Sequence, residues 1–89
     1  MENKQTLRKQ IIYRATHRGS KEMDILLGKF VKKYISDLNT NDLKNLNEII
    51  SIDDELLYDW YFNKINNEKI ANNKVSQKLR NFKLWLAER

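Results

Sequence analysis

The chain has 89 residues, of which 40% are hydrophobic and 33% are charged, and this composition predicts a single small globular domain. It has no Cys, which excludes disulfides, thiol nucleophiles and Cys-ligated zinc, and its single His, His17, leaves little for acid–base catalysis or metal binding. The net charge of +5 is uneven: residues 1–22 hold 6 basic and 2 acidic side chains, residues 23–63 hold 4 and 8, and residues 64–89 hold 7 and 2. With no Cys and one His, the chain lacks the catalytic groups that most enzyme classes use.

Hydrophobic side chains recur every three or four residues along most of the chain, Pro is absent, and no long segment alternates as a strand does. This pattern predicts an all-α fold, a single small five-helix bundle spanning residues 1–89. A first helix is expected from about Lys4 to His17, and Gly19 suits the left-handed backbone that follows many helix ends. The second helix has the longest apolar stripe, made of Met23, Leu26, Leu27, Phe30, Val31, Tyr34 and Leu38.

The third and fourth helices are marked by polar residues that favour helix starts. Thr40 is expected to cap the third helix. The fourth is expected over about residues 54–64, capped by Ser51 or Asp53, because carboxylates are favoured at the positive end of the helix dipole. The buried face of the third helix is expected to contain Leu43, Leu46, Ile49 and Ile50, and that of the fourth Leu56, Leu57, Trp60 and Tyr61.

A fifth helix is expected from about Asn73 nearly to the C-terminus, after a polar loop, residues 66–73, that should be solvated. Its apolar stripe consists of Val75, Leu79, Phe82 and Leu86. Among the aromatic residues, Trp60 and Phe82 are expected in the core, whereas Tyr58 and Trp85 lie off the main stripes and are expected to be partly exposed.

The most distinctive segment is the turn between the first two helices, where Arg18-Gly19-x-x-Glu22 is followed by Met23 and Asp24. Helix-end chemistry alone accounts for this pattern, with a cation in the last turn, a glycine cap and a carboxylate in the next first turn. An interaction surface is the other interpretation, since an Arg fork pairs with carboxylates or carbonyls and a glycine permits close approach of another backbone. This segment by itself favours the helix-end interpretation and leaves the interaction surface open.

This segment resembles the RGxxE-[LM]-D signature of the SdhE-type succinate dehydrogenase assembly factors, the flavinator family. Phe30 and Tyr34 stand where that family has aromatics on its second helix. Residues 53–60, Asp-Asp-Glu-Leu-Leu-Tyr-Asp-Trp, resemble the family's acidic run into a buried tryptophan. The resemblance covers about residues 11–63, with both motifs in the family's order and at its separation.

The resemblance implies a helical bundle that binds the flavoprotein subunit of succinate dehydrogenase, and in some bacteria that of fumarate reductase, and promotes covalent attachment of FAD. It implies an assembly factor rather than an enzyme, with FAD attached on the partner and no cofactor bound tightly by this chain. In that family the RGxxE segment is the functional surface. The residues expected to bind the partner are therefore Arg18, Gly19 and Glu22, with His17, Met23 and Asp24 as neighbours.

Other functions compete with this hypothesis. The basic ends of the chain favour, as an alternative, a small helical regulator that binds DNA or RNA, although no base-reading residues are evident. A generic helical adaptor is a third candidate. The acidic residues 53–55 and Asp59 suggest a metal site, but they lack calcium-loop spacing, so structural or interface roles are expected.

The chain has no segment that predicts membrane insertion. No apolar run reaches the roughly 18–20 residues needed to span a bilayer, and the first residues lack the apolar core of a signal peptide. We expect a cytoplasmic bacterial protein, or a mitochondrial matrix protein if a presequence has been removed.

Overall fold

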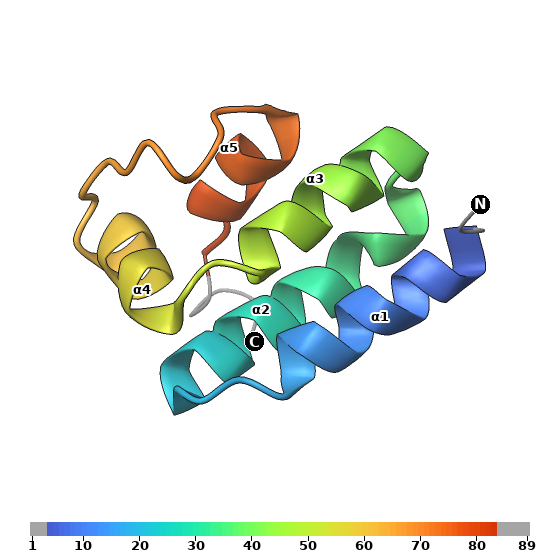
Figure 1. Ribbon diagram of the computed structural model, residues 1–89, viewed down its shortest axis with the longest axis horizontal. Helices are drawn as coiled ribbons and strands as arrows, with labels where there is room; N and C mark the ends of the chain where they lie inside the picture. Colours follow the sequence, from blue (N-terminus) through green and yellow to red (C-terminus); the bar gives the residue numbers. More distant parts are fainter. Residues whose placement is uncertain (1–3, 84–89) are drawn as a thin grey trace.

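Five α-helices and one short 3-10 helix make up the part of the chain that the computed structural model describes, residues 4–83. They are α1 (Lys4–Thr16), α2 (Lys21–Tyr34), η1 (Ile35–Asp37), α3 (Thr40–Ile50), α4 (Asp54–Phe62) and α5 (Lys74–Arg80). As Figure 1 shows, α1 packs against α2 and α3, while α4 lies against α2 and α5 against α3. The described residues contain no strand, so the all-α prediction is confirmed, and none of their helices is long and apolar enough to cross a membrane.

Short polar side chains determine where the helices begin. Ser20 caps α2, because its side chain accepts a hydrogen bond from a backbone N–H of the first turn. Asn39 caps α3 in the same way, with its Oδ1 2.8 Å from the N–H of Asp42. The prediction that Thr40 is this cap is wrong by one position, since Thr40 is the first helical residue. Asp53 stands at the cap of α4 as predicted, although its side chain makes no capping hydrogen bond.

The fifth helix is shorter than predicted. It begins with a reciprocal capping box at Asn73, where a helix start was expected, but ends at Arg80. The chain then turns and Phe82, only 6% exposed, enters the core. The remaining residues of the expected helix, 84–89, including Trp85, lie outside the described residues.

The left-handed backbone occurs at an unexpected position. No glycine within residues 4–83 has a positive φ, so the left-handed conformation predicted for Gly19 is wrong. The positive φ falls instead at Lys64, with a value of 57°, after α4 has ended at Phe62. The turn from α1 to α2 therefore uses ordinary backbone angles, and Gly19 needs a different explanation.

The apolar stripes of all five helices meet in one core. Those predicted for α2, α3 and α5 are buried in the described residues, apart from the partly exposed Tyr34. Trp60 is buried and Tyr58 is 39% exposed, as predicted, whereas Leu56 is only half-buried. The loop before α5 differs from expectation, because Ile70 is only 6% exposed and anchors it to the core.

Candidate functional site

Arg18, the first residue of the RGxxE segment, is bound inside the chain. Its guanidinium forms an ion pair with Asp54, and its Nε donates to Asp54 Oδ1 at 2.7 Å. Its two terminal nitrogens donate to the backbone carbonyl oxygens of Ile50 and Ile52, the latter at 2.9 Å. Only 9% of the side chain is exposed. Each guanidinium nitrogen thus has an acceptor within the protein, which uses the planar fork that distinguishes Arg from Lys.

Asp54 holds the other side of the same turn. Its Oδ2 accepts a hydrogen bond from the backbone N–H of Ser20 at 2.9 Å. Because Asp54 is the first residue of α4, the helix dipole also favours its negative charge. We call this set the Arg18–Asp54 clamp: the two side chains, the Ser20 N–H and the carbonyls of Ile50 and Ile52. The clamp ties the α1–α2 turn to the α3–α4 turn.

Asp54 is a residue that sequence reasoning did not place in the site. The available signal was the acidic run of residues 53–60, which matches the second family motif. The run contains several carboxylates, however, and their positions in the sequence do not show which one meets Arg18. The fold makes the choice, because Asp54 is partly buried at the contact while Asp53 is exposed.

Of the predicted partner-binding residues, Met23 is buried and Asp24 is half-buried. Met23 is only 1% exposed and belongs to the core, so in this structure it supports the turn from inside, and direct contact with a partner stays a prediction. Asp24 is half-buried, and its Oδ1 is enclosed with no hydrogen-bond partner among residues 4–83. Because an enclosed carboxylate oxygen is costly to leave unpaired, Asp24 holds an unmet acceptor beside the turn.

The outward face of the turn is formed by exposed residues. Glu22 accepts a hydrogen bond from the Ser20 hydroxyl at 3.1 Å. Gly19 is exposed, and a Cβ added there would lie 3.8 Å from Asp54 Oδ2, an ordinary contact. The fold itself therefore has room for a side chain at Gly19. What the glycine provides is bare backbone on the outer surface.

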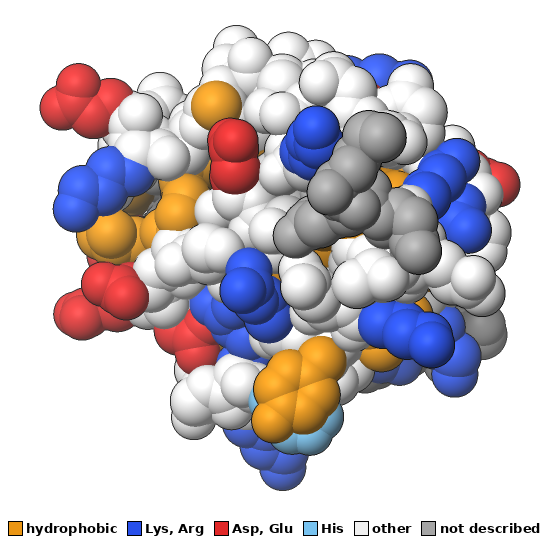
Figure 2. Space-filling model, turned by 45° about the vertical axis from the view of Figure 1, so that its right-hand side comes forward, with side chains coloured by type: hydrophobic (Ala, Val, Ile, Leu, Met, Phe, Trp, Pro, Cys, Tyr) orange, Lys and Arg blue, Asp and Glu red, His pale blue; other side chains and the backbone are white. Residues whose placement is uncertain are grey.

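The rings of His17 and Tyr13 stack on each other beside this face, and we call this pair the ledge. The two rings stack with centroids 4.0 Å apart and planes inclined by 16°, and His17 Nδ1 lies 2.9 Å from the Tyr13 carbonyl oxygen. Tyr13 is 63% exposed. Figure 2 shows the pale blue His side chain at the surface against a hydrophobic ring. Tyr13 was not predicted as a site residue; its signal is an aromatic side chain on the outward face of a basic helix.

A shallow hollow of about 360 Å³ adjoins the ledge, between the end of α1, Gly19 and residues 50–54. Within residues 4–83 no group of three or more His, Asp or Glu side chains is placed to hold a metal ion. The site thus combines exposed rings, a carboxylate and bare backbone on a turn that the clamp holds in place. Such a surface is suited to recognising another protein.

Comparison with known proteins shows which family the chain resembles in sequence. A family model described as "Flavinator of succinate dehydrogenase" matches residues 9–83. The FAD assembly factor SdhE of Acetobacter pasteurianus is 34% identical over 58 residues, which cover 65% of this chain and 53% of that protein. The FAD assembly factor SdhE of Coxiella burnetii is 32% identical over 62 residues, covering 70% of this chain and 76% of that protein.

A mitochondrial relative also matches. Succinate dehydrogenase assembly factor 2 of Arabidopsis thaliana is 29% identical over 59 residues, covering 66% of this chain and 31% of that protein. The chain thus spans about half the length of the Acetobacter relative and about a third of the Arabidopsis one. The family model covers both halves of the clamp and the exposed turn, and the predicted family is confirmed: the chain belongs to the family of flavinators of succinate dehydrogenase.

Proposed function

We propose that this chain is an assembly factor that binds the flavoprotein subunit of succinate dehydrogenase and promotes covalent attachment of FAD to it. The observation that carries the proposal is the family match over residues 9–83. The two bacterial relatives, both FAD assembly factors, support it. The flavoprotein subunit of fumarate reductase is a second partner to test, because the motif resemblance implies it for some bacteria.

In this proposal the chain acts by binding and not as an enzyme. Flavin attachment is chemistry of the partner's own residues, and this chain holds no cofactor tightly. Its binding energy stabilises a minor conformation of the flavoprotein in which the attachment residue and the flavin are correctly placed. This is a population shift, whose size is limited by the difference in affinity for the two conformations.

The docking surface in this proposal is the outward face of the α1–α2 turn. Gly19 lets the partner's backbone approach, and Glu22 and the stacked His17 ring offer polar contacts. Arg18 and Met23 lie beneath this face and keep the turn in shape, Arg18 through the clamp and Met23 through the core. Substitution of Arg18 therefore disturbs the turn itself and is a poor test of partner contact.

The sharper test is Gly19→Arg. The full chain is co-expressed with the succinate dehydrogenase flavoprotein subunit, and covalently bound flavin is measured by its fluorescence on a denaturing gel. Wild type should raise the flavin signal above that of the subunit alone, and Gly19→Arg should abolish the increase, because the added side chain projects from the docking face. Asn41→Arg, which adds the same charge at an exposed position at the start of α3, should behave as wild type.

The outcomes separate the proposal from its alternatives. If wild type leaves the flavin signal unchanged with both the succinate dehydrogenase and fumarate reductase subunits, the proposed function is wrong. If Gly19→Arg is folded and fully active, the function stands and the docking surface lies elsewhere. A nucleic-acid-binding regulator would instead bind DNA or RNA with an affinity that falls steeply as salt rises.

A further inference from the structure

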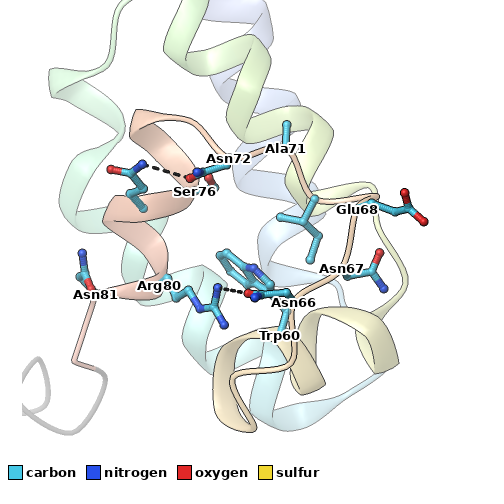
Figure 3. Close-up of a pocket in the computed structure, with 11 residues that line it drawn as sticks. Trp60, Asn66, Asn67, Glu68, Ala71, Asn72, Ser76, Arg80 and Asn81 are labelled. Carbon is cyan, nitrogen blue, oxygen red and sulfur yellow. Dashed lines mark hydrogen bonds between the residues drawn. The ribbon is translucent and has the colours of Figure 1, made fainter.

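A second and larger hollow lies away from the α1–α2 turn. It has a volume of about 670 Å³ and opens between residues 66–72 and α5, with Trp60 and Ile70 in its lining (Figure 3). We call it the α5 groove. Trp60 and Ile70 are 5% and 6% exposed, so they present small apolar areas within a mostly polar wall. The volume is within the range of roughly 300–1,000 Å³ typical of ligand sites.

Arg80 is the cation of this groove. Its guanidinium carbon lies 5.2 Å from the Trp60 ring centroid, and one terminal nitrogen donates to Asn66 Oδ1 at 2.7 Å. No carboxylate in the described part of the chain is within ion-pair distance of it. The cation–π contact and the hydrogen bond hold the guanidinium in place while leaving donors without a charged acceptor in the described residues. This is the arrangement of a preformed carboxylate receptor.

Carboxamides line much of the remaining wall. Gln77 donates from Nε2 to Asn72 Oδ1 at 3.0 Å, which leaves the Gln77 oxygen and N–H groups of Asn72 for other partners. Asn67 accepts a backbone hydrogen bond from Lys69, and its amide nitrogen is not used in that bond. A wall with both donors and acceptors matches the alternating N–H and C=O groups of an extended peptide.

The charge around the groove favours a negatively charged ligand. Within the described residues 64–83, 6 side chains are basic and one, Glu68, is acidic. Glu68 lines the groove, but Figure 3 shows its carboxylate pointing away from Arg80. One helix, α4, also reaches both the proposed docking surface and the groove. Asp54 of the clamp begins that helix and Trp60 lies six residues later, which corresponds to a rise of about 9 Å along the axis.

We propose that the α5 groove binds an extended acidic peptide segment, with one carboxylate paired to Arg80, the peptide backbone on the carboxamides, and a small apolar side chain over Trp60 and Ile70. Building on the proposed function, the segment belongs to the flavoprotein subunit that docks at the α1–α2 turn. The groove is then a second contact, which selects the partner by charge and does not itself act on the flavin.

The test uses overlapping short peptides that cover the flavoprotein subunit, each with a matched copy in which Asp and Glu are replaced by Asn and Gln. Binding to the full-length chain is measured in solution by fluorescence anisotropy of labelled peptides. We expect one acidic segment to bind, its neutral copy to bind at least about tenfold more weakly, and Arg80→Gln to cause a similar loss. Arg80→Lys should recover only part of the affinity, because the ammonium lacks the planar fork.

Lys69→Gln is the matched control, since it removes the same charge from the neighbouring loop at a residue that does not line the groove. Equal losses for Lys69→Gln and Arg80→Gln would overturn the proposal, because binding would then follow net charge alone. The absence of any bound peptide would also overturn it. Flavin attachment by wild type is measured in parallel, so failure of the groove is distinguished from failure of the proposed function.

Discussion

The hollow at the α1–α2 turn and the α5 groove are built from interactions of very different range. At the α1–α2 turn, Arg18 and Asp54 are 36 positions apart in the sequence, and their contact is nearly buried. In the α5 groove, the corresponding pairs are 14 positions apart for Arg80 with Asn66 and 5 for Gln77 with Asn72, and they lie at the surface. The turn is shaped by the whole fold, whereas the groove is shaped largely by one loop and one helix.

This difference sets how far a substitution is felt. Removing a member of the clamp leaves a charge or carbonyls unpaired between two turns that join four helices, so the whole bundle loses stability. Removing a surface side chain of the groove costs less stability, because water can hydrogen-bond to the polar group that has lost its partner. The substitutions below test this difference in stability between buried contacts and surface contacts.

Asp54→Ala should have the largest effect. It leaves the Arg18 guanidinium largely buried without its carboxylate and removes the acceptor of the Ser20 N–H. We expect a loss of about 3 kcal/mol in the free energy of unfolding, measured by urea denaturation. Asp53→Ala, at the exposed neighbouring position without a capping hydrogen bond, should cost less than about 0.5 kcal/mol. Equal costs would show that the clamp contributes no net stability.

Ile70→Ala should have the next largest effect. Ile70 is only 6% exposed and anchors the loop before α5, so its truncation should lower the free energy of unfolding by about 2 kcal/mol. Ile65→Ala in the same loop removes the same atoms from a residue that is 53% exposed, and should cost less than about 0.5 kcal/mol. If both variants lose the same free energy of unfolding, Ile70 does not anchor the loop, and the loop is solvated as its polar composition predicts.

The helices of this protein could be predicted because their signals are local. Apolar spacing identified the buried faces of α2, α3 and α5, and polar residues located the helix starts to within about a residue. The miss at Asn39 and Thr40 has a simple cause, since both side chains can accept the capping hydrogen bond. The end of α5 was missed because Phe82 fits a helical stripe and also a turn into the core.

The site was less predictable because it depends on contacts distant in sequence. The family motif located the turn, but a helix-end Arg is equally compatible with exposure and with burial. Only the fold brings Arg18 to Asp54 and places Met23 in the core. Ile70 was missed for a related reason: the few apolar residues of an Asn-rich loop, such as Ile65 and Ile70, show no periodicity that tells a buried one from an exposed one.

Gly19→Ala should have the smallest effect on stability and is the most informative about function. Because Gly19 has no positive φ and its new Cβ would make only an ordinary contact, we expect the free energy of unfolding to rise by about 0.5 kcal/mol, through a less flexible unfolded chain. If the partner's backbone lies against Gly19, flavin attachment should nevertheless fall in the co-expression assay.

Gly28→Ala provides the matched comparison. This position lies inside α2, and its new Cβ would be 3.7 Å from Thr16 Cγ2. Helix propensity should make Gly28→Ala more stable by up to about 1 kcal/mol, with flavin attachment unchanged. A Gly19→Ala chain that is stable but less active, beside a Gly28→Ala chain that is stable and fully active, would assign the glycine of the RGxxE segment to the partner surface. A strongly destabilised Gly19→Ala would assign it to the fold and contradict the docking surface proposed above.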